Sequence, residues 1–351
     1  MSWDVGRTSM AGAERILTAC KPTSPNPGWW HAAGNLVPAW QPNRYIGWIL
    51  LIGGLASATW LDAATSSAVI GMAVLQLAAA RTLILPSQTL SLRQPAAWFM
   101  GLGSLAYATG KTQPSNWAGS AWLVPAGALM CFAGFLLLLW KDIRCGAARD
   151  RKVILATICL AMLLAAAVEL IGANLGLTLG TPVAPEDDLR LRMLRLAQVG
   201  VTMLPALTLL HQGLAAKGYP DTGSVQWPQV CLSVGTLGMP AILTAAAMTH
   251  TGVKFLLPIP TITLFAGTVS GLWLARRVAR RLERWSWLLI ALCMAGGLFM
   301  GMYAFDGPLA PPDFIGGYND PVRRGIRLAH AYSIVLGVVG IVVSRELDSG
   351  Y

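Results

Sequence analysis

Residues 153–178 read VILATICLAMLLAAAVELIGANLGLT, an apolar run that contains a single acidic side chain, that of Glu169, and no basic one. A helix needs about 20 consecutive, predominantly apolar residues to cross the hydrocarbon core of a bilayer. The stretch is long enough for this, so it predicts a transmembrane helix. A carboxyl group inside such a helix is energetically costly, which makes Glu169 a candidate functional residue.

The rest of the chain has the same character. Of its 351 residues, 55% are hydrophobic and 12% are charged, whereas a typical soluble domain has about 25% charged residues. We therefore predict an all-α polytopic membrane protein with about ten transmembrane helices in a lipid bilayer. The predicted spans are 46–64, 66–85, 119–140, 153–178, 194–214, 228–249, 255–275, 285–304 and 327–344, with a short, glycine-rich tenth at 96–109 that either crosses the bilayer or re-enters it.

The net charge of +10 comes from basic residues in short loops between the apolar runs. Such loops collect on the cytoplasmic side of membrane proteins, so the pattern argues against nucleic-acid binding and orients the chain. Ten spans place both termini and the loops at 141–152 and 276–284 in the cytoplasm. The expected location is the bacterial cytoplasmic (inner) membrane, with an N-terminal tail at 1–45 and a C-terminal tail at 346–351.

An internal similarity predicts how the spans are organised. DLRLRMLRLAQ at 188–198 resembles DPVRRGIRLAH at 320–330, and each block lies between two predicted spans. This indicates a duplicated four-helix unit. The first membrane repeat covers 46–215, with two extra spans inserted near 96–140. A cytoplasmic linker at 216–227 joins it to the second repeat at 228–345. Repeats with an even number of spans keep their orientation, as in several transporter folds.

Both arginine blocks face outward in this topology, against the usual preference for cytoplasmic positive charge. One interpretation is structural: Asp320 caps a helix whose first residue is Pro321, and the arginines extend to the lipid headgroups. The other is a surface that binds an anion, a quinone or a partner, because guanidinium groups offer paired donors in a fixed geometry. The candidate binding residues are Arg192, Arg195, Arg324 and Arg327.

Four more candidates lie on the same predicted side of the membrane. Asp62 and His250 each end a span there, and His330 lies within the first turns of the last span. Glu169 lies in the outer third of its span, where it is either protonated and hydrogen-bonded between helices or paired with an arginine such as Arg195. Together with the arginine blocks, these residues predict a binding site near the outer face.

Two functional hypotheses follow from these residues. The first is a multi-pass membrane protein that binds or moves a small solute, or serves as a non-catalytic subunit among other membrane subunits. The second is a redox subunit that binds haem b or quinone at the outer face, with His250 and His330 as ligands of a haem iron or another metal. The chain has no GxSxG, HExxH or kinase signature, which disfavours an enzyme of those classes. No cofactor is specified by the sequence.

Overall fold

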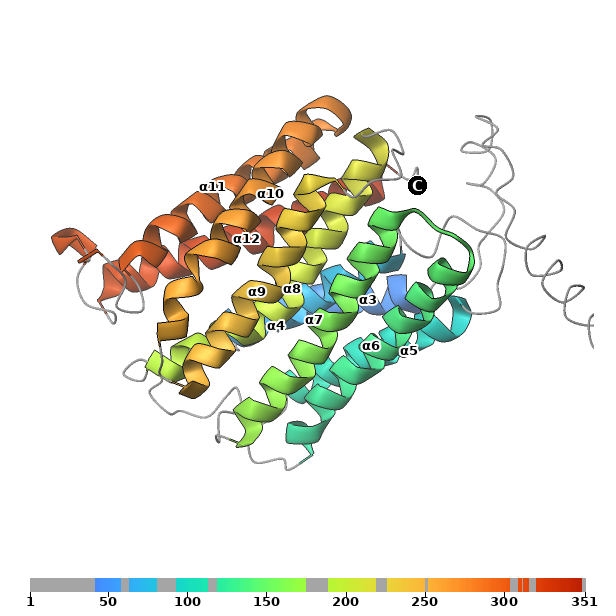
Figure 1. Ribbon diagram of the computed structural model, residues 1–351, viewed down its shortest axis with the longest axis horizontal. Coiled ribbons are helices and arrows are strands. Elements are labelled where there is room, and N and C mark those ends of the chain that lie inside the picture. Colours follow the sequence, from blue (N-terminus) through green and yellow to red (C-terminus); the bar gives the residue numbers. More distant parts are fainter. Residues whose placement is uncertain are drawn as a thin grey trace, which may run out of the picture.

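The computed structural model describes residues 42–57, 63–80, 93–112, 119–174, 189–218, 226–249, 252–303, 309–310, 312–315 and 320–348. Within these ranges the protein is all-helical (Figure 1). Two short 3₁₀ helices are η3 (Gly252–Leu256) and η4 (Asp313–Ile315). The ten α-helices are α3 (Pro42–Ser57), α4 (Ala63–Ala79), α5 (Arg93–Thr112), α6 (Ser120–Arg144), α7 (Arg149–Asn174), α8 (Leu189–Gly218), α9 (Trp227–Thr249), α10 (Pro258–Val278), α11 (Arg281–Tyr303) and α12 (Pro321–Leu347).

Local sequence signals explain several helix ends. The Asp320 carboxylate accepts a hydrogen bond from the backbone N–H of Val322 at 2.9 Å, and Pro321 is the first residue of α12. The predicted cap is therefore confirmed. The turn between α6 and α7 contains Gly146 with φ of 65°, a conformation that glycine adopts without steric cost.

Seven of the described helices, α6 to α12, are long and apolar enough to cross a membrane. The protein is thus a multi-pass membrane protein. Of the roughly ten spans predicted from the sequence, these seven are supported by their length and composition. At about 1.5 Å per residue, the 16 residues of α3 and the 17 of α4 extend about 24–26 Å, less than the core of roughly 30 Å. The predicted segment at 96–109 is part of α5, a continuous helix of 20 residues.

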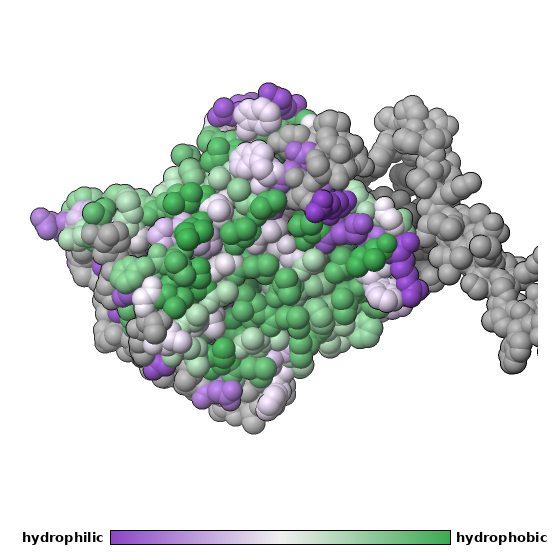
Figure 2. Space-filling view, in the orientation of Figure 1, coloured by the Kyte–Doolittle hydropathy of each residue, from purple (hydrophilic) through white to green (hydrophobic). Residues whose placement is uncertain are grey.

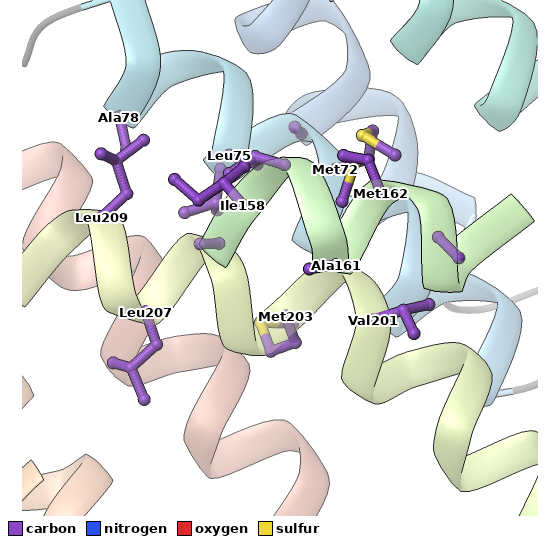
Figure 3. Packing of buried hydrophobic residues seen from close by; sticks show 14 of the residues in the cluster. Met72, Leu75, Ala78, Ile158, Ala161, Met162, Val201, Met203, Leu207 and Leu209 are labelled. Atoms are coloured by element: carbon purple, nitrogen blue, oxygen red, sulfur yellow. The ribbon is translucent and has the colours of Figure 1, made fainter. Parts of the chain in front are cut away.

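The core of the protein surrounds α4 and α8. Every residue of α4 from Thr65 to its end is buried, and this helix packs against α3, α5, α8 and α12. A Cβ atom on Gly71 would lie 2.8 Å from the Thr202 hydroxyl of α8, so the two backbones are in close contact. Figure 3 shows side chains of α4, α7 and α8 within the same apolar cluster.

Apolar side chains also cover much of the outer surface. Ile262 of α10, Leu292 of α11 and Leu336 of α12 are each more than half exposed. Figure 2 shows a broad hydrophobic surface over the helices, with hydrophilic residues gathered at their ends. This distribution is the reverse of a soluble helical bundle and fits helices that face lipid.

Ion pairs place several chain segments at one end of the bundle. Arg44, near the start of α3, pairs with Glu346, near the end of α12. Arg280, between α10 and α11, pairs with Asp348, just after α12. The start of α3 and the end of α12 thus lie at the same end of the bundle.

The turn between α6 and α7 belongs to this end as well. The Thr157 hydroxyl, near the start of α7, donates to the Ser233 hydroxyl, near the start of α9, at 3.0 Å. The start of α9 follows the end of α8, and the Leu210 carbonyl near that end accepts from Arg345 of α12 at 2.8 Å. We call this side, with the 141–152 and 276–284 loops, the basic end.

The two predicted repeats have different helix neighbours. α4 packs against α3, α5, α8 and α12, whereas its expected counterpart α10 packs against α8, α9 and α11. No internal repeat is detected among the described helices. The duplication therefore remains a prediction from the sequence.

Candidate functional site

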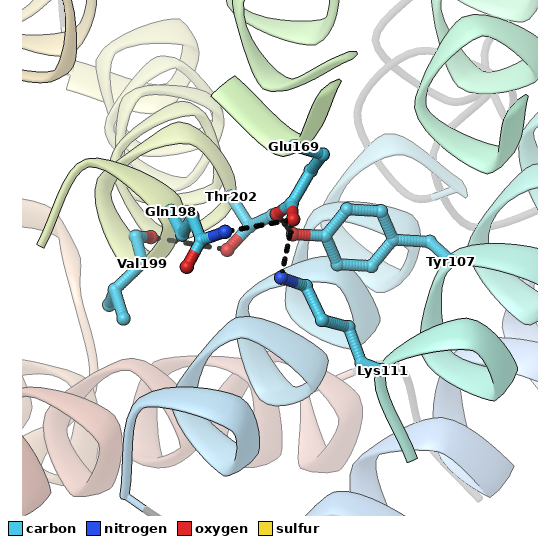
Figure 4. Close-up of polar contacts among 6 residues, drawn as sticks. All are labelled: Tyr107, Lys111, Glu169, Gln198, Val199 and Thr202. Carbon is cyan, nitrogen blue, oxygen red and sulfur yellow. Dashed lines mark hydrogen bonds and ion pairs between the residues drawn. The ribbon is translucent and has the colours of Figure 1, made fainter. Parts of the chain in front are cut away.

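Glu169 is the centre of a buried polar cluster. Its side chain lies on α7 and is 6% exposed. One carboxylate oxygen accepts from the Tyr107 hydroxyl at 2.9 Å, and the other accepts from Lys111 Nζ at 2.7 Å and from the Gln198 side-chain amide at 3.0 Å. Figure 4 shows the three donors, from α5 and α8, converging on the carboxylate.

The spacing on α5 explains two of these contacts. Tyr107 and Lys111 are four residues apart, so they lie on the same face of the helix. That face is directed into the bundle, and the Lys111 side chain is 3% exposed. The Lys111 ammonium also lies 5.6 Å from the centre of the Tyr107 ring. The cluster therefore places an ammonium, a phenol and an amide around one carboxylate in a site that excludes bulk water.

A second layer of polar side chains adjoins this cluster. Ser104, three residues before Tyr107 on α5, donates to the Met100 carbonyl at 2.8 Å. Its hydroxyl is 3.5 Å from the Cys131 thiol of α6, which is itself 4.0 Å from the Gln76 amide of α4. All of these side chains are buried. Polar groups thus continue from Glu169 toward α4 and α6 inside the protein.

The outer arginine candidates lie apart from Glu169. Glu169 pairs with Lys111 and not with Arg195, which had been a possible partner in the sequence. Arg192 and Arg195 are half-buried on the first turns of α8. Their neighbour Arg190, which had no predicted role, donates to the Ala247 carbonyl at the end of α9 at 2.8 Å.

The second arginine block lies at the start of α12. Arg324 is exposed, whereas Arg327 and His330 are half-buried. A Cβ atom on Gly297 of α11 would lie 2.8 Å from the His330 ring, so this histidine packs directly against the α11 backbone. This side of α12 contacts α11, while the Glu169 cluster is made by α5, α7 and α8. The structure does not bring the two sets of candidates together.

Asp62 and His250 lie outside the described residues. The proposed pairing of His250 with His330 around a haem iron therefore stays a prediction, as does quinone binding. Among the residues that are described, no group of three histidine, cysteine, aspartate or glutamate side chains could hold a metal ion. Of the predicted site residues, Glu169 is therefore the one whose hydrogen-bond partners define a candidate site.

Neither the family models nor the curated proteins and solved structures compared with the chain give a match. The function must accordingly be argued from the site itself.

A further buried ionic cluster lies near the basic end, among residues that were not predicted as site candidates from the sequence. Arg345 of α12 donates to one oxygen of Glu283 of α11 at 2.6 and 2.9 Å and to the Leu210 carbonyl of α8. His211 is fully buried beside it, with its ring 6.0 Å from that of Trp287 in an edge-on arrangement. Among the described residues, a buried ion pair therefore lies toward each end of the bundle.

Proposed function

We propose that this multi-pass membrane protein binds or moves a small anionic solute at Lys111, with Glu169 as the group that exchanges protons. The observation that supports this proposal is the convergence of Lys111, Tyr107 and Gln198 on one buried carboxylate between three helices.

Stability alone is a poor explanation for such a cluster. Taking two charges out of water costs several kcal/mol per ion, and apolar side chains of similar volume often stabilise a protein as well or better. Ionisable groups at membrane depth are, for the same reason, rare and usually functional. The buried pair therefore supports a role in binding or transport more strongly than a role in folding.

The chemistry of the pair suggests how a solute and a proton would be linked. While Glu169 is ionised, it neutralises the Lys111 ammonium. When Glu169 takes up a proton, the ammonium is left without its counter-ion, and a carboxylate or phosphate group of a solute can replace it. Loss of the proton restores the pair and displaces the anion. Tyr107 and Gln198 keep the Glu169 side chain in place during this exchange.

The orientation is part of the proposal. Basic loops are retained in the cytoplasm, so the basic end faces inward in the bacterial cytoplasmic membrane and both termini are cytoplasmic. Glu169 lies toward the other end of α7 and would be reached from outside. The duplicated unit is also kept as a proposal, and it is supported by the similarity between the sequence blocks at 188–198 and 320–330.

Charge movement in proteoliposomes tests the proposal. Protein reconstituted on a solid-supported membrane is exposed to a rapid pH jump, and the transient current is recorded. We expect wild-type protein to give a current that protein-free liposomes lack. Glu169→Gln should reduce it several-fold, because the amide keeps the shape of the side chain but binds no proton.

Glu346→Gln is the matched control, because it makes the same substitution at a partly exposed ion pair at the basic end. It should leave the current unchanged. A wild-type current equal to that of protein-free liposomes, or a current equally large in Glu169→Gln, would refute the proposal.

A further inference from the structure

Five arginines lie within nine residues at the turn between α10 and α11. They are Arg276, Arg277, Arg280, Arg281 and Arg284, and all five are exposed. Among the described residues, Arg280 pairs with Asp348, and Arg284 donates to the Ala279 carbonyl at 2.9 Å. The remaining three present their positive charges at the surface.

An aromatic side chain holds one of these three in place. The Arg277 guanidinium lies 3.7 Å from the centre of the Trp273 ring, a cation–π contact. Trp273 is 45% exposed, and Trp285 on the facing helix is 59% exposed. Exposed tryptophans are enriched where a membrane protein meets the headgroup layer. We therefore expect the arginines to lie at the depth of the phosphate groups.

Apolar stripes lead from the arginines along both helices. On α10, Ile262, Val269 and Trp273 are exposed and spaced by seven and four residues, so they share one face. On α11, Trp285 and Leu292 are exposed and seven residues apart. Figure 2 shows hydrophilic residues at the upper end of the molecule, where Figure 1 places the α10–α11 turn, above a hydrophobic surface. A ligand that fits both parts has an anionic head and long apolar chains.

We propose that Arg276, Arg277 and Arg281 form a binding site for the phosphate headgroup of an anionic phospholipid, whose acyl chains lie along α10 and α11. Guanidinium groups suit phosphate because they donate two hydrogen bonds in a fixed plane. The apolar stripes favour a lipid over a free anion. This site is separate from Glu169 and is independent of the solute proposed above.

Native mass spectrometry of the detergent-purified protein tests the site. Phosphatidylglycerol, phosphatidylcholine and inorganic phosphate are added separately, and the bound fraction is measured against concentration. We expect phosphatidylglycerol to bind more tightly than the other two. Each guanidinium near a membrane surface contributes about fivefold in affinity, so Arg277→Gln should weaken phosphatidylglycerol binding by about that factor. The combined Arg276→Gln, Arg277→Gln and Arg281→Gln variant should weaken it by roughly a hundredfold.

The matched control removes Arg323 and Arg324 at the opposite end, and should leave the affinity within about twofold. Circular dichroism and gel filtration establish that each variant is folded. Equal binding of phosphatidylcholine, or an unchanged affinity in the folded triple variant, would overturn the proposal. Inorganic phosphate that competes fully with phosphatidylglycerol would also overturn it, by showing that a free anion is the ligand.

Discussion

Glu169 and Lys111 carry opposite charges and form the ion pair within their cluster. The two side chains are 6% and 3% exposed, so neither charge is solvated by bulk water. If one partner is removed, the other remains as an uncompensated charge inside the protein. If both are replaced by apolar side chains, neither desolvation cost remains. A double-mutant cycle can therefore separate the cost of leaving one charge unpaired from the cost of burying both charges.

We expect Lys111→Met alone to lower the free energy of unfolding by about 3–5 kcal/mol, because it leaves the Glu169 carboxylate unpaired. Adding Glu169→Leu should recover most of that loss. The measurement is the unfolding of purified protein in detergent, followed by circular dichroism during titration with a denaturing detergent. Arg44→Gln, which breaks a partly exposed pair, should cost no more than about 1 kcal/mol. A double variant as unstable as the sum of the single variants would contradict this prediction.

Sequence reasoning identified Glu169 but missed its partners, because those partners come from other helices. Glu169 stands out because a single carboxyl group interrupts a long apolar run. Lys111 lies just beyond the predicted end of the 96–109 span, where a lysine is unremarkable. Its distance of four residues from Tyr107 was the available signal, but it shows only that the two share a face. Which helix that face contacts depends on packing among helices far apart in the chain.

At the scale of helices, α5 and α6 form a pair whose closeness depends on glycine. A Cβ atom on Gly127 of α6 would lie 2.5 Å from both the Gly103 carbonyl oxygen and the Tyr107 backbone nitrogen of α5. Real side chains do not approach backbone atoms this closely. Small residues at such positions let membrane helices pack by van der Waals contact, in the absence of a strong hydrophobic driving force. The same contact fixes the position of Tyr107 along the helix axis, beside Glu169.

Gly127→Ala should therefore push α5 away from α6 and destabilise the protein by about 1–3 kcal/mol, as overpacking does. It should also reduce the pH-jump current, since Tyr107 would be displaced. Gly301→Ala on α11 is the control, because a Cβ atom there meets open space. Unfolding titrations of both variants provide the comparison. If Gly127→Ala and Gly301→Ala have the same free energy of unfolding, the close contact between α5 and α6 is contradicted.

The helices themselves were largely predictable, and their arrangement was not. Apolar runs located all seven of the described helices that are long and apolar enough to span a membrane, and Asp320 with Pro321 marked the start of α12. Hydropathy gives the length of an apolar run, but it does not show which other helices pack against that run. It could not distinguish α4, enclosed by protein on all sides, from helices such as α11 that expose Leu292. The same limitation affects the duplication, because two similar sequence blocks do not determine which helices pack together.

Across the whole molecule, the distribution of charge defines two different ends. The basic end contains the α6–α7 and α10–α11 turns, the start of α3 and the end of α12. The Glu169 cluster lies toward the other end. Positive loops are retained on the cytoplasmic side during insertion, and this asymmetry predicts the orientation of every described helix.

Cysteine labelling in intact cells tests the orientation. In a cysteine-free background, Arg280→Cys should react with a membrane-impermeant reagent only after the membrane is opened. Leu309→Cys, which replaces a side chain that is 53% exposed between α11 and α12, should react in intact cells. Labelling of residue 280 from outside would reverse the orientation. Labelling of both residues from the same side would contradict the fold, because α11 separates them.

The burial of α4 has a consequence for how the protein is made. During translation α4 is synthesised early, whereas α8 and α12, two of the helices that enclose it, are synthesised much later. Until then its buried Thr65, Ser66 and Gln76 would face lipid or the insertion machinery. A nascent chain ending at residue 188 should therefore be degraded faster than one ending at residue 225, which includes α8. Pulse-chase measurements of the two truncated chains would show whether α8 protects the chain from degradation by covering α4. Equal half-lives would show that it does not.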